Sequence, residues 1–376
     1  MQSRLHPIGR RQHGLSLIEI LVGVAIGIIG VLAIFQTVAV WSKHTQVTSA
    51  GGDAQVAGTL ALFSIERDLK QAGHGFGTAL APVMGCDVQA SGPVATRAFN
   101  FPLTPVSINP GAAGEPDEIS VLYGNSSFFV DTATFSFSTP TTKKLARRNG
   151  FKPGDLAVIA GNGSASAASA TCQLVEITAD TNVDGLTVDH ATGTYTSYYS
   201  AASGVNRFNT ALGTGTTFSA GSIYDIGPQP VRNTWKILNG RSLVRSELIQ
   251  NAPETEIAEG VVNLKAQYGI DADANHQISA AEWSASAPTD WTNVFAIRIA
   301  VLVRSRQFER NGDPSASAPV AVTASAPTWA GGAFAMRNVD GTTDTFGPGI
   351  PDPNNWRYYR YRVYERVIPF RNRLWN

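Results

Sequence analysis

Hydrophobic and polar positions divide this chain into an apolar N-terminal segment, an amphipathic continuation and a long region of short runs. From residue 15 to residue 41 the segment is almost entirely apolar, and Glu19 is its only formal charge. A helix rises about 1.5 Å per residue, so this length is enough to cross a bilayer core. Three arginines precede the segment: Arg4, Arg10 and Arg11. By the positive-inside rule they hold the N-terminus in the cytoplasm and place the chain after Trp41 on the opposite side of the membrane.

The amphipathic continuation extends from residue 42 to residue 73. Apolar residues recur there at intervals of three, four or seven positions, as on one side of a helix: Val47, Ala54, Ala57, Ala61, Ile65 and Leu69. Gly51 and Gly52 predict a bend or local melting, because each glycine costs a helix about 1 kcal/mol relative to alanine. Gly73, Gly75 and Gly77 supply the left-handed residues that end a helix, so we expect it to stop there.

From residue 74 onward, short runs of β-forming residues alternate with turn residues. The predicted strands include 117–123, 155–160, 173–178 and 222–226. In two later runs one face is apolar, made by Val262, Leu264, Ala266, Tyr268 and Ile270 and by Ile297, Ile299, Val301 and Val303. This alternation predicts half-buried strands of an antiparallel sheet. Stretches of low complexity predict long surface loops at 161–171, 191–222 and 312–332.

These patterns predict an α+β fold, in which a long N-terminal transmembrane helix packs on an antiparallel β-sheet with loop insertions. The 376 residues are 43% hydrophobic and 15% charged, with no net charge, so a sizeable core can form. Neutrality argues against a protein dedicated to nucleic acid, although a local basic patch is compatible with it. The sequence has no nucleophile-elbow, zinc-protease or phosphate-loop motif, and its six histidines are scattered. We therefore predict that the protein is not an enzyme.

The run Gly14-Leu-Ser-Leu-Ile-Glu19 adds a specific signal at the start of the apolar segment. It resembles the cleavage and methylation signature of type IV prepilins, in which a prepilin peptidase cuts after the glycine and the new N-terminal residue is methylated. The resemblance implies cleavage between Gly14 and Leu15 and N-methylation of Leu15. Leucine stands here where phenylalanine is most common in the family.

Four further blocks resemble the PilW group of minor pilins: 66–73, 258–271, 296–305 and 361–372. The resemblance implies a subunit that works with other minor and major pilins to initiate and assemble a type IV pilus, which serves twitching motility and adhesion. It implies a prepilin leader (1–14), a transmembrane or filament-core helix (15–41), its continuation outside the membrane (42–73) and a β-rich globular domain (74–376). The expected location is the inner membrane of a Gram-negative bacterium, with the C-terminal domain in the periplasm, and then the extracellular pilus.

Glu19 has a physical cost as well as a family resemblance. A carboxylate inside a membrane segment costs roughly 2.5–3.5 kcal/mol on insertion scales, so it suggests a function. One interpretation is a glutamate near the interface that reaches water. The other is an assembly role, in which Glu19 pairs with the amine of Leu15 on a neighbouring subunit, a group that exists only after cleavage. Gly23 and Gly27 form a GxxxG element, which lets helices approach closely in lipid.

The chain has two cysteines, Cys86 and Cys172. The predicted topology places both outside the cytoplasm, where disulfides persist, so a single bridge between them is the economical interpretation. Closing a loop of that length would stabilise the fold by about 4–5 kcal/mol on the chain-entropy model. Two unpaired buried thiols are the alternative.

Residues 271–282 carry the sharpest chemical signal. Oxygen-bearing residues occupy positions 1, 3, 5, 7, 9 and 12 of a calcium loop: Asp271, Asp273, Asn275, Gln277, Ser279 and Glu282. His276 departs from the pattern, because it stands where glycine makes the sharp turn. A single loop that binds Ca²⁺ is one hypothesis. The other is an Asx-rich turn that enters a short helix, with Ser279 and Glu282 as its capping box.

Two alternative functions remain open at this point. A type II secretion pseudopilin shares the N-terminal motif and the topology. A DNA-binding minor pilin is suggested by 357–366, where arginines and tyrosines alternate as phosphate contacts and base stacking require. An ordinary amphipathic last strand would show the same pattern, with Arg360, Arg362, Tyr364 and Arg366 on one face.

Overall fold

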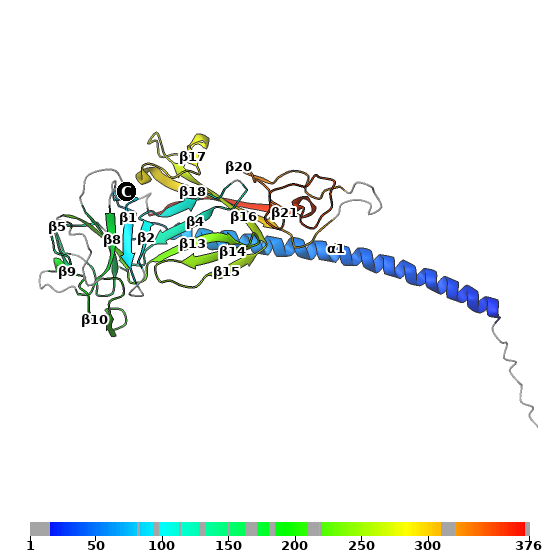
Figure 1. Cartoon of the computed structure of the whole chain (residues 1–376), viewed down its shortest axis with the longest axis horizontal. Coiled ribbons are helices and arrows are strands. Elements are labelled where there is room, and N and C mark those ends of the chain that lie inside the picture. The colour runs from blue at the N-terminus through cyan, green and yellow to red at the C-terminus, as the bar shows by residue number, and fades with distance from the viewer. Residues whose placement is uncertain are drawn as a thin grey trace, which may run out of the picture. The chain divides into compact units, whose positions relative to one another are not determined.

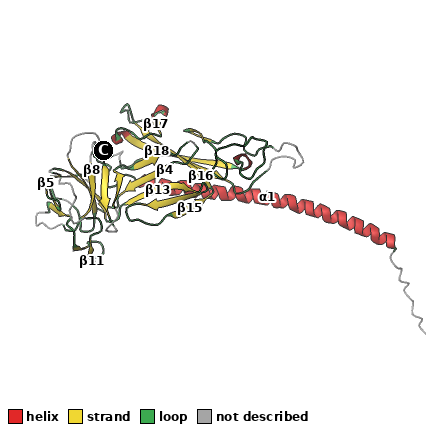
Figure 2. Ribbon diagram, viewed as in Figure 1, coloured by secondary structure: helices red, strands yellow, loops and turns green. Residues whose placement is uncertain are grey.

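The computed structural model describes most of the chain and separates it into two compact units, 1–52 and 53–376. The described residues are 16–80, 83–92, 98–112, 114–127, 132–148, 150–161, 171–179, 185–209, 218, 220–309 and 320–372. Helix α1, Leu17–Gln71, begins in the first unit and ends in the second. The second unit holds all the strands that the structure describes (Figures 1 and 2). The predicted boundaries at residues 14, 41 and 73 stay predictions.

Helix α1 is unbroken in its hydrogen-bonding pattern. Residues Gly51 and Gly52 are helical, so of the predicted bend or local melting the melting is wrong, whereas the bend stays a prediction. Two glycines cost about 2 kcal/mol, whereas a new helix would have to form its first turn again at an entropic cost. The predicted end is confirmed, because α1 stops at Gln71 and Gly73 follows with φ of +80°.

Three largely antiparallel sheets make up most of the second unit. The eight-stranded sheet has the order β2 (Ala98–Pro102), β1 (Asp87–Ser91), β8 (Thr171–Glu176), β7 (Leu156–Gly161), β12 (Gly221–Gly227), β5 (Ala133–Ser138), β6 (Thr142–Leu145) and β9 (Thr187–Asp189). Its strands β1 and β8 pair in parallel, and its other neighbours pair antiparallel. The predicted α+β class is confirmed.

The other two large sheets lie next along the unit (Figure 1). The five-stranded sheet has the order β15 (Thr255–Glu259), β14 (Ser242–Glu247), β13 (Val231–Leu238), β4 (Glu118–Tyr123) and β3 (Val106–Asn109). The four-stranded sheet has the order β17 (Trp283–Ser284), β16 (Val261–Ile270), β18 (Val294–Arg304) and β21 (Tyr361–Pro369). Two small hairpins are β10 (Thr194–Thr196) with β11 (Ser203–Val205) and β19 (Thr328–Trp329) with β20 (Gly332–Ala333). Short 3₁₀ turns are η1 (Ala280–Glu282), η2 (Trp291–Asn293) and η3 (Trp356–Tyr358).

One hydrophobic core joins the last turns of α1 to the five- and four-stranded sheets. Ala61, Ile65 and Leu69 are fully buried on the inner side of the helix. They share a cluster with Trp235 of β13 and Ile299 of β18. Burying each aliphatic side chain contributes about 1.5–3 kcal/mol, so this face holds the helix on the sheets.

Strands β16 and β18 differ from the prediction in two places. A β-bulge between Val261 and Asn263 turns Val262 away from the main core, so Val262 does not share the face of Leu264 as predicted. Strand β18 is buried on both faces rather than half-buried. Ala300 and Leu302 on its second face pack against Phe334, which follows β20.

The cover on that second face comes from a segment predicted to be a surface loop. Residues 312–319 of it lie outside the described residues, but 328–333 form the β19–β20 hairpin. Arg298 of β18 contacts two indole rings, with its guanidinium 4.8 Å from the centroid of Trp283 and 5.5 Å from that of Trp329. Cation–π contacts of this kind stabilise by roughly 0.5–2 kcal/mol each, so they fasten the hairpin to the sheet. The predicted loop at 191–222 likewise contains β10 and β11.

Candidate functional site: the apolar helix and the aspartate loop

The N-terminal part of α1 is one candidate site. Among the described residues, one helix is long and apolar enough to span a membrane: Leu17–Ser42, with 26 residues and a mean hydropathy of 2.8. No residue of its most apolar stretch is buried against other parts of the described structure. So large an apolar surface marks contact with lipid or with other apolar helices. The predicted cleavage site, Gly14 and Leu15, lies outside the described residues.

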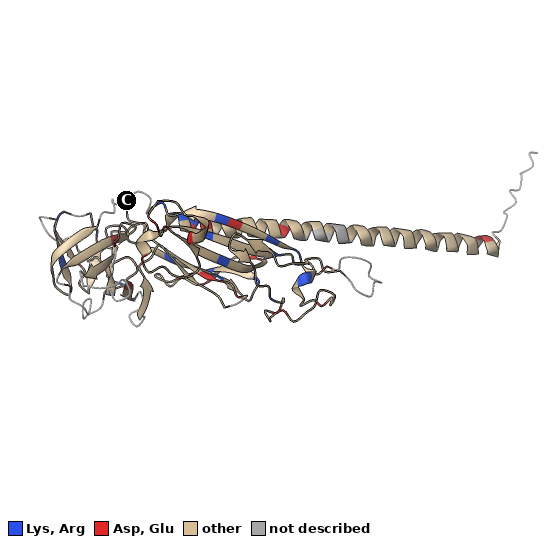
Figure 3. Ribbon diagram, turned by 90° about the horizontal axis from the view of Figure 1, so that it is seen from above, with Lys and Arg blue, Asp and Glu red and all other residues tan. Residues whose placement is uncertain are grey.

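Glu19 lies in the first turn of α1, where its backbone N–H donates to the carbonyl of Ser16 at 2.9 Å. A carboxylate at a helix N-terminus is favoured by the helix dipole. Figure 3 shows that few residues along this helix are charged. Nothing lies within 4 Å of a β-carbon built on Gly23 or Gly27, so the glycine surface is open to another helix.

Asp68 holds the other end of α1 and was missed by the sequence reasoning. It is fully buried, and its Oδ2 accepts hydrogen bonds from Asn233 Nδ2 at 2.7 Å and from Trp235 Nε1 at 3.1 Å. Its Oδ1 accepts from Tyr123 Oη at 3.3 Å. Burial raises the pKa of Asp68. The signal was available, because Asp68 stands three residues after Ile65, within the apolar stripe of the helix.

The two cysteines lie together in the core beneath the eight-stranded sheet. Cys86 and Cys172 form a disulfide with their Cα atoms 5.9 Å apart, a usual separation for such a bond. Both are fully buried. The bridge fastens the entry of β1 to β8, the strand with which β1 pairs in parallel.

The aspartate loop connects β16 to β17 and is organised around Asp271, which is 2% exposed. Its two carboxylate oxygens accept hydrogen bonds from the backbone N–H groups of Asn275 at 3.1 Å and His276 at 2.9 Å. His276 has φ of +62°, the left-handed conformation for which glycine is preferred at this place. The loop therefore makes the sharp turn with histidine.

Glu282 closes the loop from its far end. Its oxygens accept from the backbone N–H groups of Ser279 at 2.7 Å and Ala272 at 2.9 Å, and these bonds lower the pKa of Glu282. Asp271, Asp273 and Glu282 each offer an oxygen, and these three oxygens lie within 4.8 Å of one another. Two oxygens bound to one Ca²⁺ at about 2.4 Å are at most about 5 Å apart, so the spacing suits a shared cation.

The other predicted ligands of the loop are exposed. Asn275 Oδ1 accepts from the backbone N–H of Gln277 at 2.7 Å, and Asn275 Nδ2 donates to Asp273 at 2.8 Å. Ser279 and Glu282 form the capping box of η1. The loop therefore has both the Asx-turn geometry of one hypothesis and the carboxylate cluster of the other.

The alternation of arginine and tyrosine in β21 has structural partners. Arg360 pairs with Glu309 at 2.9 Å, and Arg366 lies 3.6 Å from Glu66 of α1. Tyr364 packs on the main core. Two of the three arginines on the predicted DNA-binding face therefore already have carboxylate partners.

Comparisons with known proteins agree with this arrangement. Residues 233–372 match the family model of the type IV pilus-assembly protein W, PilW. Residues 9–35 match the prokaryotic N-terminal methylation motif. No curated protein matches the chain. A solved structure, a type IV-like pilin from Thermus thermophilus, is 8% identical, covers 84% of this chain and 94% of its own, and superposes with a TM-score of 0.30, too low to support an argument.

The two family matches lie where the sequence resemblance was found, at the apolar helix and over the four-stranded sheet with part of its neighbour. An N-terminal methylation motif implies processing by a prepilin peptidase and association with other pilins. The resemblance is therefore confirmed over these residues: 233–372 are similar to PilW, and 9–35 carry the prokaryotic N-terminal methylation motif.

Proposed function

We propose that this protein is a minor pilin that takes part in initiating and assembling a type IV pilus, together with other minor pilins and the major pilin. The observation that carries the proposal is the apolar segment 17–42. None of its most apolar stretch is buried in the structure, and Glu19 lies in its first turn. A structural, non-catalytic role fits such a subunit, because its exposed apolar surface is suited to lipid first and to neighbouring helices afterwards.

The proposed route begins in the inner membrane of a Gram-negative bacterium, with residues after Ser42 in the periplasm. A prepilin peptidase cuts between Gly14 and Leu15, and Leu15 is N-methylated. The carboxylate of Glu19 then pairs with the new amine of a neighbouring subunit as the helix leaves the lipid. An unpaired carboxylate is costly in an apolar filament core, so this pair would select correctly docked subunits.

The test is removal of the gene from its host, followed by counting surface filaments and measuring type II secretion in the same cells. We expect few or no filaments, normal secretion, and rescue of filaments by the unaltered gene. Normal filaments with lost secretion would instead support the pseudopilin. Binding of DNA by the purified chain, lost when Arg360, Arg362 and Arg366 are replaced, would support the DNA-binding alternative.

A second proposed property is Ca²⁺ binding by the aspartate loop. It is supported by three carboxylate oxygens within 4.8 Å of one another around the buried Asp271. Like charges so close repel one another unless a cation offsets them. Asp271, Asp273, Asn275, Gln277, Ser279 and Glu282 would supply the oxygens, directly or through water. Weak affinity would suffice, because extracellular calcium modules have Kd values of about 10⁻⁴–10⁻³ M.

A further inference from the structure

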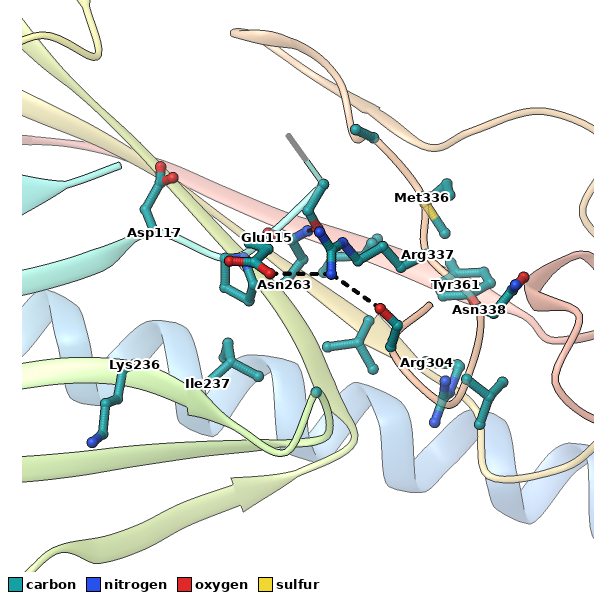
Figure 4. A pocket seen from close by; sticks show the side chains of 18 of the residues that line it. Glu115, Asp117, Lys236, Ile237, Asn263, Arg304, Met336, Arg337, Asn338 and Tyr361 are labelled. Carbon is teal, nitrogen blue, oxygen red and sulfur yellow. Dashed lines mark hydrogen bonds and ion pairs between the residues drawn. The ribbon is translucent and has the colours of Figure 1, made fainter. Parts of the chain in front are cut away.

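A cavity of about 340 Å³ lies in the second unit between the five- and four-stranded sheets and the segment that follows β20. Its walls come from the loop 114–118, the end of β13, the strands β16 and β18, and residues 335–341. Figure 4 shows these side chains around the opening. The volume lies at the lower end of the range for small-molecule sites, about 300–1,000 Å³.

Three cations line this cavity, and two of them are neutralised. Lys236 pairs with Glu254 at 2.7 Å. Arg337 pairs with Glu115 at 3.1 Å across the opening, and it also donates to the carbonyl of Gly341 at 3.0 Å (Figure 4). The third cation, Arg304, has no carboxylate partner within the described part of the chain.

Arg304 is stacked rather than ion-paired. Its guanidinium lies 5.0 Å from the ring centroid of Tyr359, and it lies near the hydroxyl of Tyr361. Stacking uses the flat face of the guanidinium, whereas its N–H donors point outward in the plane and suit a carboxylate. In Figure 4 Arg304 lies on the side of Tyr361, away from Glu115 and Asp117.

The rest of the lining offers apolar contact. Ile237, Val262 and Leu302 line the cavity with hydrocarbon, and Met336 and Val339 add to it. An anion that fits the cavity would therefore need an apolar body beside its charged end. The bulge at Val262 matters here, because it turns that side chain to the cavity side of the sheet.

We propose that this cavity binds a small organic monocarboxylate, with the carboxylate on Arg304 and a branched apolar body against Ile237, Val262 and Leu302. This binding is independent of the assembly role and of the aspartate loop. Charge-assisted hydrogen bonds to a guanidinium are among the stronger polar contacts, so the carboxylate decides the affinity.

The test is isothermal titration of the full chain in detergent with N-acetyl-leucine and, as the matched neutral probe, N-acetyl-leucinamide. We expect the acid to bind at least about tenfold more tightly than the amide. Non-specific entry into micelles would favour the neutral amide. Tighter binding of the acid than of the amide therefore identifies binding to Arg304. Arg304→Gln should remove the preference for the acid, Arg304→Lys should keep part of it, and Lys236→Gln, a control on a paired cation of the same cavity, should keep it fully.

Circular dichroism and melting curves establish that each variant is folded before it is titrated. Equal binding of the acid and the amide by the unaltered chain would overturn the proposal, as would no binding of the acid up to about 10 mM. Equal loss of binding in Lys236→Gln and Arg304→Gln would overturn the assignment to Arg304.

Discussion

The ring of Tyr364 on β21 lies directly on Gly58 of α1, in the place that a β-carbon would occupy. A β-carbon built on Gly58 would be 2.1 Å from Cε2 of that ring. The half-buried ring packs against the main core and lies opposite Val301 of β18, so it can withdraw only by losing these contacts. Glycine in the middle of a helix is usually a defect, but here it admits the ring and lets helix and strand approach closely.

We expect Gly58→Ala to destabilise the fold although alanine is the better helix former. The gain in helix propensity is about 1 kcal/mol, whereas overpacking in a filled core costs about 1–3 kcal/mol or more. Denaturant unfolding of the full chain should show a net loss of up to about 2 kcal/mol. Gly51→Ala is the matched control, because nothing lies within 4 Å of a β-carbon at Gly51. A Gly58→Ala chain as stable as Gly51→Ala would show that the ring moves freely.

Glu19→Ala should leave processing intact and impair entry into the filament. The proposed cleavage site follows Gly14, five residues earlier, whereas the proposed pair with the amine of Leu15 needs the charge. Breaking a buried ion pair costs about 3–5 kcal/mol, so filament number should fall more than tenfold. Mass spectrometry should still find Leu15 at the N-terminus with its methyl group. Glu19→Gln, which keeps the shape and removes the charge, should fail equally; normal filaments in both variants would leave Glu19 a bystander at the interface.

Calcium should stabilise the chain through the aspartate loop. At 10 mM Ca²⁺ and a Kd of about 1 mM, binding adds about 1.4 kcal/mol, which raises the melting temperature by about 2–4 °C. Asp271→Ala with Asp273→Ala should abolish the rise. His276→Gly should leave the rise in place, because glycine adopts φ near +62° without strain and the loop has this conformation before a cation binds. Identical melting of the unaltered chain in Ca²⁺ and in chelator would disprove the metal site.

Asp225 on β12 should make stability depend on pH between about 4 and 6. Burial, with the nearby charge of Asp155, raises the pKa of Asp225 to about 6. The folded state then holds a proton that the unfolded state has released above its pKa of about 3.9, so the free energy of unfolding falls as pH rises through this window. Asp225→Asn should flatten that slope, because an amide does not titrate. The fold should be kept, because the amide can still bond with Ser126 and accept from the N–H of Gly227, as the carboxylate does now. A slope unchanged in Asp225→Asn would assign it to other groups.

The sequence by itself determined the elements whose signal is local. An apolar run of helical length, glycines after Gln71 and period-two alternation in β16 and β18 depend on neighbours along the chain, so they could be predicted. The N-terminal methylation motif was also readable, because it is contiguous. The spacing of the aspartate loop identified candidate ligands and the need for positive φ at His276, but it left open whether a metal binds there.

Only the tertiary structure decided the features that join distant segments. Asp68 is an ordinary helix acid in the sequence, and it becomes an anchor because Asn233 and Trp235, more than 160 residues later, donate to it. The bulge at Val262 shifts a side chain between faces without any local signal. The second face of β18 is buried because a segment about 30 residues later returns over it. The contact of Gly58 with Tyr364 has the same cause, and so does the lack of a carboxylate partner for Arg304 among the residues that the structure describes. Each depends on which surfaces meet, and packing across the fold sets that.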